Sequence, residues 1–74
     1  MLNLTLDQVR VRLGPREWES MKLFAKGHTN NEIARILFRS PKTISTQRSR
    51  VKAKLQINTS VEWMEFLKLV GEAV

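Results

Sequence analysis

Three signals for the start of a helix punctuate the middle of this 74-residue chain and leave only short segments between them. Pro15 suits a first helical turn, where the missing amide proton is not needed. Thr29 and Glu32 have the spacing of a capping box, in which each side chain accepts a hydrogen bond from the other residue's amide. Ser40-Pro41 combines an N-cap hydroxyl with a second proline in a first turn. Helix starts this close together predict a bundle of short helices.

Apolar residues recur at helical spacing behind each start and set the expected helix lengths. We expect helices at residues 15–26, 30–37, 41–55 and about 60–70. These helices form one all-α domain over residues 13–70.

The N-terminal arm, residues 1–12, is ambiguous. Leucines at positions 2, 4 and 6 alternate as in a strand, whereas Thr5 and Gln8 resemble a capping box. We favour a short arm with one or two helical turns.

Positive charge is concentrated on one segment. The chain has 13 Lys and Arg against 7 Asp and Glu, a net charge of +6, and no acidic residue lies between Glu32 and Glu62. A concentrated positive field indicates a polyanionic partner. The alternative is a solvated basic face that only aids solubility.

Several function classes are excluded by what the sequence lacks. It has one His, no Cys, no glycine-rich phosphate loop and no paired carboxylates, so we expect no enzyme, no metal site and no cofactor. No apolar stretch approaches the roughly 20 residues that span a bilayer, so we expect no membrane partner. We therefore expect a soluble, cytoplasmic protein.

A short helix, a tight turn and a longer basic helix form the outline of a helix-turn-helix. The helix at 41–55 is too polar and too positive for an interior role, which separates this reading from an ordinary helical bundle. It is the expected recognition helix, lying in the major groove of double-stranded DNA.

The run from Leu13 to Ile57 resembles the DNA-binding domain of LuxR-type (NarL/FixJ or GerE-like) bacterial transcription regulators. The motifs that carry the resemblance occur in family-like order, as Leu13-x-Pro15-Arg16-Glu17, Gly27, Asn31-Glu32-Ile33-Ala34, Leu37, Ser40-Pro41-Lys42-Thr43-Ile44 and Lys54-Leu55. The resemblance implies a four-helix helix-turn-helix domain and a sequence-specific regulator of transcription. Family members usually carry a sensory domain before this one, and we expect none in the dozen residues that precede it here.

By position, the resemblance also implies roles for residues around the recognition helix. The base-contacting residues are Ser45, Thr46 and Ser49. The residues implied to contact phosphates are Asn31, Lys42, Thr43, Arg48 and Lys52. Arg50 lies away from the expected reading face, and we treat it as a further candidate for a phosphate contact.

Three departures from the family pattern concern this helix. Gln47 stands where the family often has His, and the side chains of Ser45 and Ser49 are shorter than those of many relatives. Gln56 replaces a glycine that normally follows Lys-Leu, which suggests that the helix runs on or ends without a left-handed cap.

The last helix is more apolar than one core-facing stripe requires, so part of it is expected to meet a partner. The resemblance implies a homodimer through this helix, with an interface formed by Trp63, Phe66, Leu67 and Val70. The alternative is that these side chains only fill a small core.

The competing function is a protein-interaction module that modulates another regulator or RNA polymerase. The short base-reading side chains and the apolar last helix favour it, whereas the basic run argues for DNA. We prefer DNA binding, with protein contacts as an addition.

Overall fold

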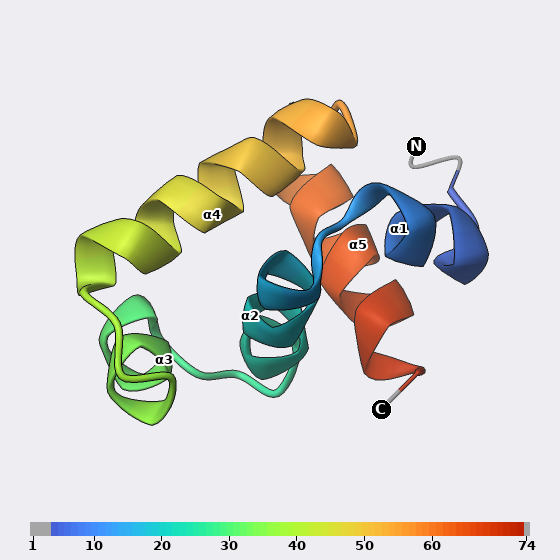
Figure 1. Ribbon diagram of the computed structural model, residues 1–74. Coiled ribbons are helices and arrows are strands. Elements are labelled where there is room, and N and C mark those ends of the chain that lie inside the picture. Colours follow the sequence, from blue (N-terminus) through green and yellow to red (C-terminus); the bar gives the residue numbers. More distant parts are fainter. Residues whose placement is uncertain (1–3, 74) are drawn as a thin grey trace.

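The computed structural model describes residues 4–73, which form five helices and no strand. The helices are α1 (Leu6–Arg12), α2 (Pro15–Ala25), α3 (Asn30–Ile36), α4 (Pro41–Lys54) and α5 (Ser60–Gly71). The all-α prediction is confirmed, and each of the four predicted helices ends within one residue of its expected position. Figure 1 shows α4 as the longest rod, lying along one side of the molecule with α3 at one of its ends.

The predicted caps form. Thr29 accepts a hydrogen bond from the Glu32 amide while the Glu32 carboxylate accepts one from the Thr29 amide, and Ser40 caps α4 by accepting from the Thr43 amide. Thr59 and Glu62 make the same reciprocal pair at the start of α5. Each box satisfies two backbone donors that a helix N-terminus otherwise leaves open.

The ambiguous arm is helical over α1, where the reciprocal bonds between Thr5 and Gln8 close a capping box. Leu4 and Leu6 therefore do not form the alternative strand, and Leu2 lies outside the described residues. Val9 is fully buried, so α1 contributes directly to the core.

The interior consists of two apolar clusters connected by α4, with α2 packed against α3, α4 and α5. The larger cluster contains Val51 from α4 and its C-cap Leu55, and the smaller one contains Ile44 from the N-terminal half of α4. The clusters together contain the buried residues Val9, Leu13, Met21, Ile33, Ala34, Ile44, Val51, Leu55, Ile57, Phe66 and Val70. Because both ends of α4 are anchored, its orientation on the domain is fixed.

Three helices end with a residue in the left-handed region, at Gly27 (φ 95°), Phe38 (φ 56°) and Gln56 (φ 56°). Beyond α4, the Gln56 amide donates to Ala53 and the Ile57 amide to Lys52, the two bonds of a Schellman motif. The suggestion that α4 lacks a left-handed cap is therefore wrong. The two satisfied carbonyls hold the turn even though glutamine carries a Cβ.

Replacing Gln56 by glycine should stabilise the domain. Relief of about 1–2 kcal/mol of left-handed strain outweighs the roughly 0.5–1 kcal/mol of extra chain entropy that glycine brings. We expect Gln56→Gly to raise the free energy of unfolding by about 0.5–1 kcal/mol in urea denaturation. Gln56→Ala, which keeps the Cβ, is the matched control and should leave it nearly unchanged. A destabilised glycine variant would contradict this account of the cap.

Candidate nucleic-acid interface

The four sides of α4 differ in what they face. At about 100° per residue, the apolar positions form one narrow seam towards the core. The opposite side is exposed and carries Lys42, Thr46, Ser49 and Ala53. Two flanks separate these sides, one towards α2 and the other towards α3 and α5. The exposed side carries only short side chains after Lys42, so a binding surface could approach the helix closely.

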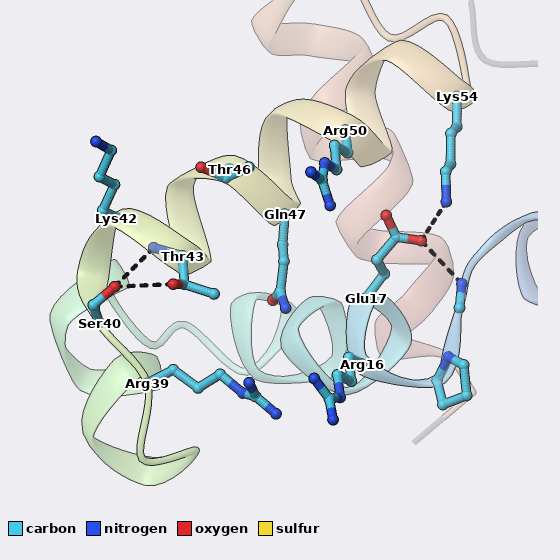
Figure 2. Close-up of a pocket in the computed structure, with 12 residues that line it drawn as sticks. Arg16, Glu17, Arg39, Ser40, Lys42, Thr43, Thr46, Gln47, Arg50 and Lys54 are labelled. Atoms are coloured by element: carbon cyan, nitrogen blue, oxygen red, sulfur yellow. Dashed lines mark hydrogen bonds and ion pairs between the residues drawn. The ribbon is translucent and has the colours of Figure 1, made fainter.

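The flank towards α2 opens into a basic groove of about 900 Å³. Its cationic lining residues come from α2, from the turn before α4 and from α4 itself: Arg16, Arg39, Lys42, Arg50 and Lys54. In Figure 2 the side chains of Arg16 and Arg39 point towards one another along the floor of the groove. No ion pair to Arg16, Arg39 or Arg50 is found in the described part of the chain, so their positive charge is available to an anion.

Glu17 is the acidic residue of this groove, and its carboxylate is already hydrogen-bonded within the domain. Its Oε1 atom accepts from Lys54 Nζ at 2.6 Å and from the Gly14 amide at 2.9 Å, as the dashed lines in Figure 2 mark. Partial burial raises the pKa of Glu17, but these hydrogen bonds and the charges of Lys54 and Arg50 outweigh it and lower the pKa overall. Glu17 therefore ties the start of α2 to the end of α4.

A buried polar link makes a second connection between α2 and α4. The Ser20 side chain is fully buried, and its hydroxyl donates to Gln47 Oε1 at 2.6 Å. Gln47, the residue that departs from the family pattern, thus holds α4 against α2. Ser20 was not among the residues expected at this site, although a serine between the apolar positions of a helix is a signal for such a buried bond.

The opposite flank carries Ser45, Arg48 and Lys52, and all three are partly engaged within the domain. The Asn30 amide group donates to Ser45 Oγ at 2.8 Å. The Arg48 guanidinium lies 5.8 Å from the ring centroid of Phe24, and Lys52 Nζ lies 5.0 Å from that of Trp63. These cation–π contacts hold both charges at the edge of the helix.

The remaining predicted contact residues lie at the starts of α3 and α4. Asn31 and Lys42 are exposed, whereas Thr43 is half-buried and its hydroxyl lies 2.9 Å from Ser40 Oγ. The structure therefore gathers Lys42, Thr46 and Ser49 on one surface and turns Ser45 partly away from it. Sequence reasoning missed Arg16 and Arg39, because only the folded chain brings them beside α4.

The expected dimer interface needs a correction. Phe66 and Val70 are fully buried within this chain, where they belong to the larger cluster, so they have no exposed surface for a second copy. Trp63 and Leu67 are half-buried. The exposed apolar residues of α5 are Val61 and Met64, at 67% and 65%.

The described residues contain no group of three His, Asp or Glu side chains placed to hold a metal ion. None of the helices between residues 4 and 73 is long and apolar enough to cross a membrane.

Comparison with known proteins gives consistent matches. The model of the family "Bacterial regulatory proteins, luxR family" matches residues 11–67. The transcriptional regulatory protein RcsB of Escherichia coli (strain K12) is 41% identical over 59 residues, which are 80% of this chain and 27% of that protein. The oxygen regulatory protein NreC of Staphylococcus carnosus is 39% identical over 64 residues, 86% of this chain and 29% of that protein. The chain thus spans less than a third of the length of these relatives, and no solved structure matches it.

The bond between Glu17 and Lys54 should make stability depend on pH. A carboxyl whose folded pKa is lowered contributes stability above its unfolded pKa of about 4.3 and loses it as the pH falls through the folded value. Glu17→Gln should therefore be less stable than wild type at pH 7, and the difference should shrink below about pH 4.

The expected difference at pH 7 is below about 1 kcal/mol, because the Lys54 side chain is 45% exposed and solvent screens the pair. Urea denaturation of both proteins across pH 3–7 measures it, and Lys54→Met supplies the background for a double-mutant cycle. A constant difference over this pH range would show that the ionised form of Glu17 contributes nothing.

Proposed function

Since the chain belongs to the luxR family of bacterial regulatory proteins and forms a DNA-binding domain of a transcription regulator, we propose that it binds duplex DNA sequence-specifically, with α4 in the major groove. Domains of this family are generally not enzymes. The observation that carries the proposal is the exposed side of α4, which is free of acidic residues and has short side chains between two cationic flanks.

Base contacts are assigned to the exposed side. Thr46 and Ser49 offer hydroxyl groups to base edges, and the methyl group of Thr46 suits a thymine methyl. Ser45 completes the set from its half-buried position, where the bond from Asn30 fixes its hydroxyl. The lack of long side chains on this side lets the helix backbone approach the floor of the groove.

Phosphate contacts are assigned to both flanks and to the start of α4. Arg48 and Lys52 serve one DNA strand from the flank towards α5, with Asn31, Lys42 and Thr43 near the helix N-terminus. The basic groove adds Arg16, Arg39 and Arg50 for the other strand. Arginine and lysine contacts to phosphates fix the position of a helix in the groove but carry no sequence information.

A homodimer through α5 extends the proposal. Val61 and Met64 lie three residues apart on α5 and therefore share a face, which the half-buried Leu67 borders. Trp63 lies on another side of the helix, where its ring contacts Phe24 and Phe66. Two copies joined there would present two α4 helices to an inverted repeat. A further contact to RNA polymerase or another regulator is compatible with this arrangement, as is action in the cytoplasm, where bacterial DNA lies. The domain boundary proposed at residue 13 places α1 outside the helix-turn-helix unit.

The assignment of reading and positioning residues predicts two distinct defects. Each phosphate contact releases counterions, so Arg50→Gln or Arg16→Gln should weaken binding to all duplexes alike and reduce the log–log salt slope by about 1. Thr46→Ala should instead change the ranking among duplexes, by about 1 kcal/mol at one base pair, with the slope unchanged.

Fluorescence-anisotropy titrations over a salt series, with random duplexes and duplexes selected for tight binding, measure both effects. Lys22→Gln is the matched control, because it removes a charge from a groove that α4 does not line, and its slope should be that of wild type. The assignment fails if Thr46→Ala and Arg50→Gln reduce affinity for every duplex in the same way.

The dimer proposal predicts that Met64→Glu separates the copies, because a carboxylate would be placed in an apolar interface. We expect sedimentation equilibrium to give monomers for this variant and dimers for wild type. Affinity for a single half-site should stay unchanged, whereas affinity for the inverted repeat should fall. Dimers formed equally by wild type and Met64→Glu would rule out this face.

A further inference from the structure

The turn between α3 and α4 carries an apolar side chain that lies almost entirely in solvent. Phe38 is 95% exposed, so the ring contributes almost nothing to the core. Its backbone adopts φ 56°, in the left-handed region that favours glycine. A phenylalanine at this position therefore lowers the stability of the domain in two ways: its backbone is strained, and its apolar ring is exposed to water. The Phe38 amide donates to Arg35 and the Arg39 amide to Ala34, so a Schellman motif holds this turn as it does at Gln56. The exposed ring, rather than the backbone strain, is therefore the feature that needs an explanation.

The two residues before Phe38, Ile36 and Leu37, line an apolar groove that does not include Phe38 itself. Ile36, at the end of α3, is 46% exposed and lines a shallow groove of about 320 Å³ between α2 and α3 together with Leu23 and Leu37. No residue of α4 lines this groove. DNA that engages the exposed side of α4 would leave it uncovered, and in Figure 1 α3 lies at one end of α4 rather than along it.

The rim of this apolar surface is mainly positive. Lys22 and Lys26 border the groove between α2 and α3, with Glu19 as its acidic residue. The exposed Arg35 precedes Phe38 along the chain, whereas Arg39, which follows it, lines the basic groove assigned to DNA. A partner that fits must therefore offer an apolar pocket for a protruding ring and carboxylates around it. Phosphate groups would satisfy the charges but offer no pocket to the ring, and Phe38 lies outside α4, the helix assigned to the bases, which favours a protein over nucleic acid.

We propose that Phe38 is the anchor of a protein-docking surface, formed with Ile36 and the rim lysines, for an acidic protein surface bound to DNA beside this domain. The proposal rests on the proposed DNA-binding function and adds a contact that DNA binding does not require. Loss of this contact should leave DNA affinity intact and weaken the effect on transcription.

The test uses two substitutions of Phe38 and a matched control. Phe38→Gly removes both the ring and the strain, whereas Phe38→Ala removes the ring alone. Gln56→Gly relieves the same backbone conformation at the end of α4 without touching the docking surface. Phe38→Gly and Gln56→Gly should each raise Tm by about 2–8 °C, which also shows that the variants fold.

DNA binding is measured first, by anisotropy with the duplex selected from random DNA. If wild type binds no duplex, the proposed function itself has failed. If it binds, both Phe38 variants should bind within about twofold of wild type, because no interface anchor to DNA is lost. An affinity loss of about tenfold or more would mean that Phe38 contacts DNA, and it would overturn the proposal.

Transcription is measured second, in bacterial cells with a reporter promoter that carries the selected duplex. We expect the response to fall by about fivefold or more with both Phe38 variants, as when one anchor of an interface is lost. The double variant Lys22→Gln/Lys26→Gln should weaken it too, whereas Gln56→Gly should respond as wild type does. The same transcriptional response with wild type and both Phe38 variants would overturn the proposal. A wild-type response with Lys22→Gln/Lys26→Gln would contradict the acidic character of the partner.

Discussion

The attachment of α4 to the rest of the domain is the constraint on which the other features depend. One apolar seam, with Ile44 in the smaller cluster and Val51 in the larger, fixes the rotation of the helix about its own axis. The two polar links from α2, through Ser20 and Glu17, hold it along its length. Because the seam is narrow, most of the surface of α4 remains outside the core. A rigid, exposed basic helix is what insertion into a DNA groove requires.

The distribution of charge follows from this attachment. The rotation of α4 directs Arg50 and Lys54 to one flank and Arg48 and Lys52 to the other, so that cations border the exposed side on both edges. The flanks differ in kind. Arg48 and Lys52 are held over aromatic rings, whereas Arg50 faces an open groove with arginines from other elements. Duplex DNA has a phosphate strand on each side of its major groove, and the two flanks match that arrangement.

The helices were predictable because their start signals are local. Thr29 and Glu32 cap α3 through bonds within a single turn, so the sequence contains the whole interaction. The groove was not predictable, because Arg16, Arg39 and Arg50 are brought together only by the packing of α2 and α4. The burial of Phe66 and Val70 depends in the same way on which face of α5 meets α2, and an apolar stretch alone does not identify that face. The left-handed cap at Gln56 was not predictable from residue preferences, which favour glycine at such a position. The hydrogen bonds of the Schellman motif hold glutamine in this conformation despite its Cβ.

The central claim is that DNA meets the exposed side of α4 and the basic groove beside it. The most direct measurement is an NMR titration of the isotope-labelled protein with duplex DNA, following every backbone amide at low and at moderate salt. The account predicts the largest shifts at Lys42, Thr46, Ser49 and Arg50, with small shifts along α1. Shifts confined to α5 or α1, or the absence of shifts at low salt, would contradict it.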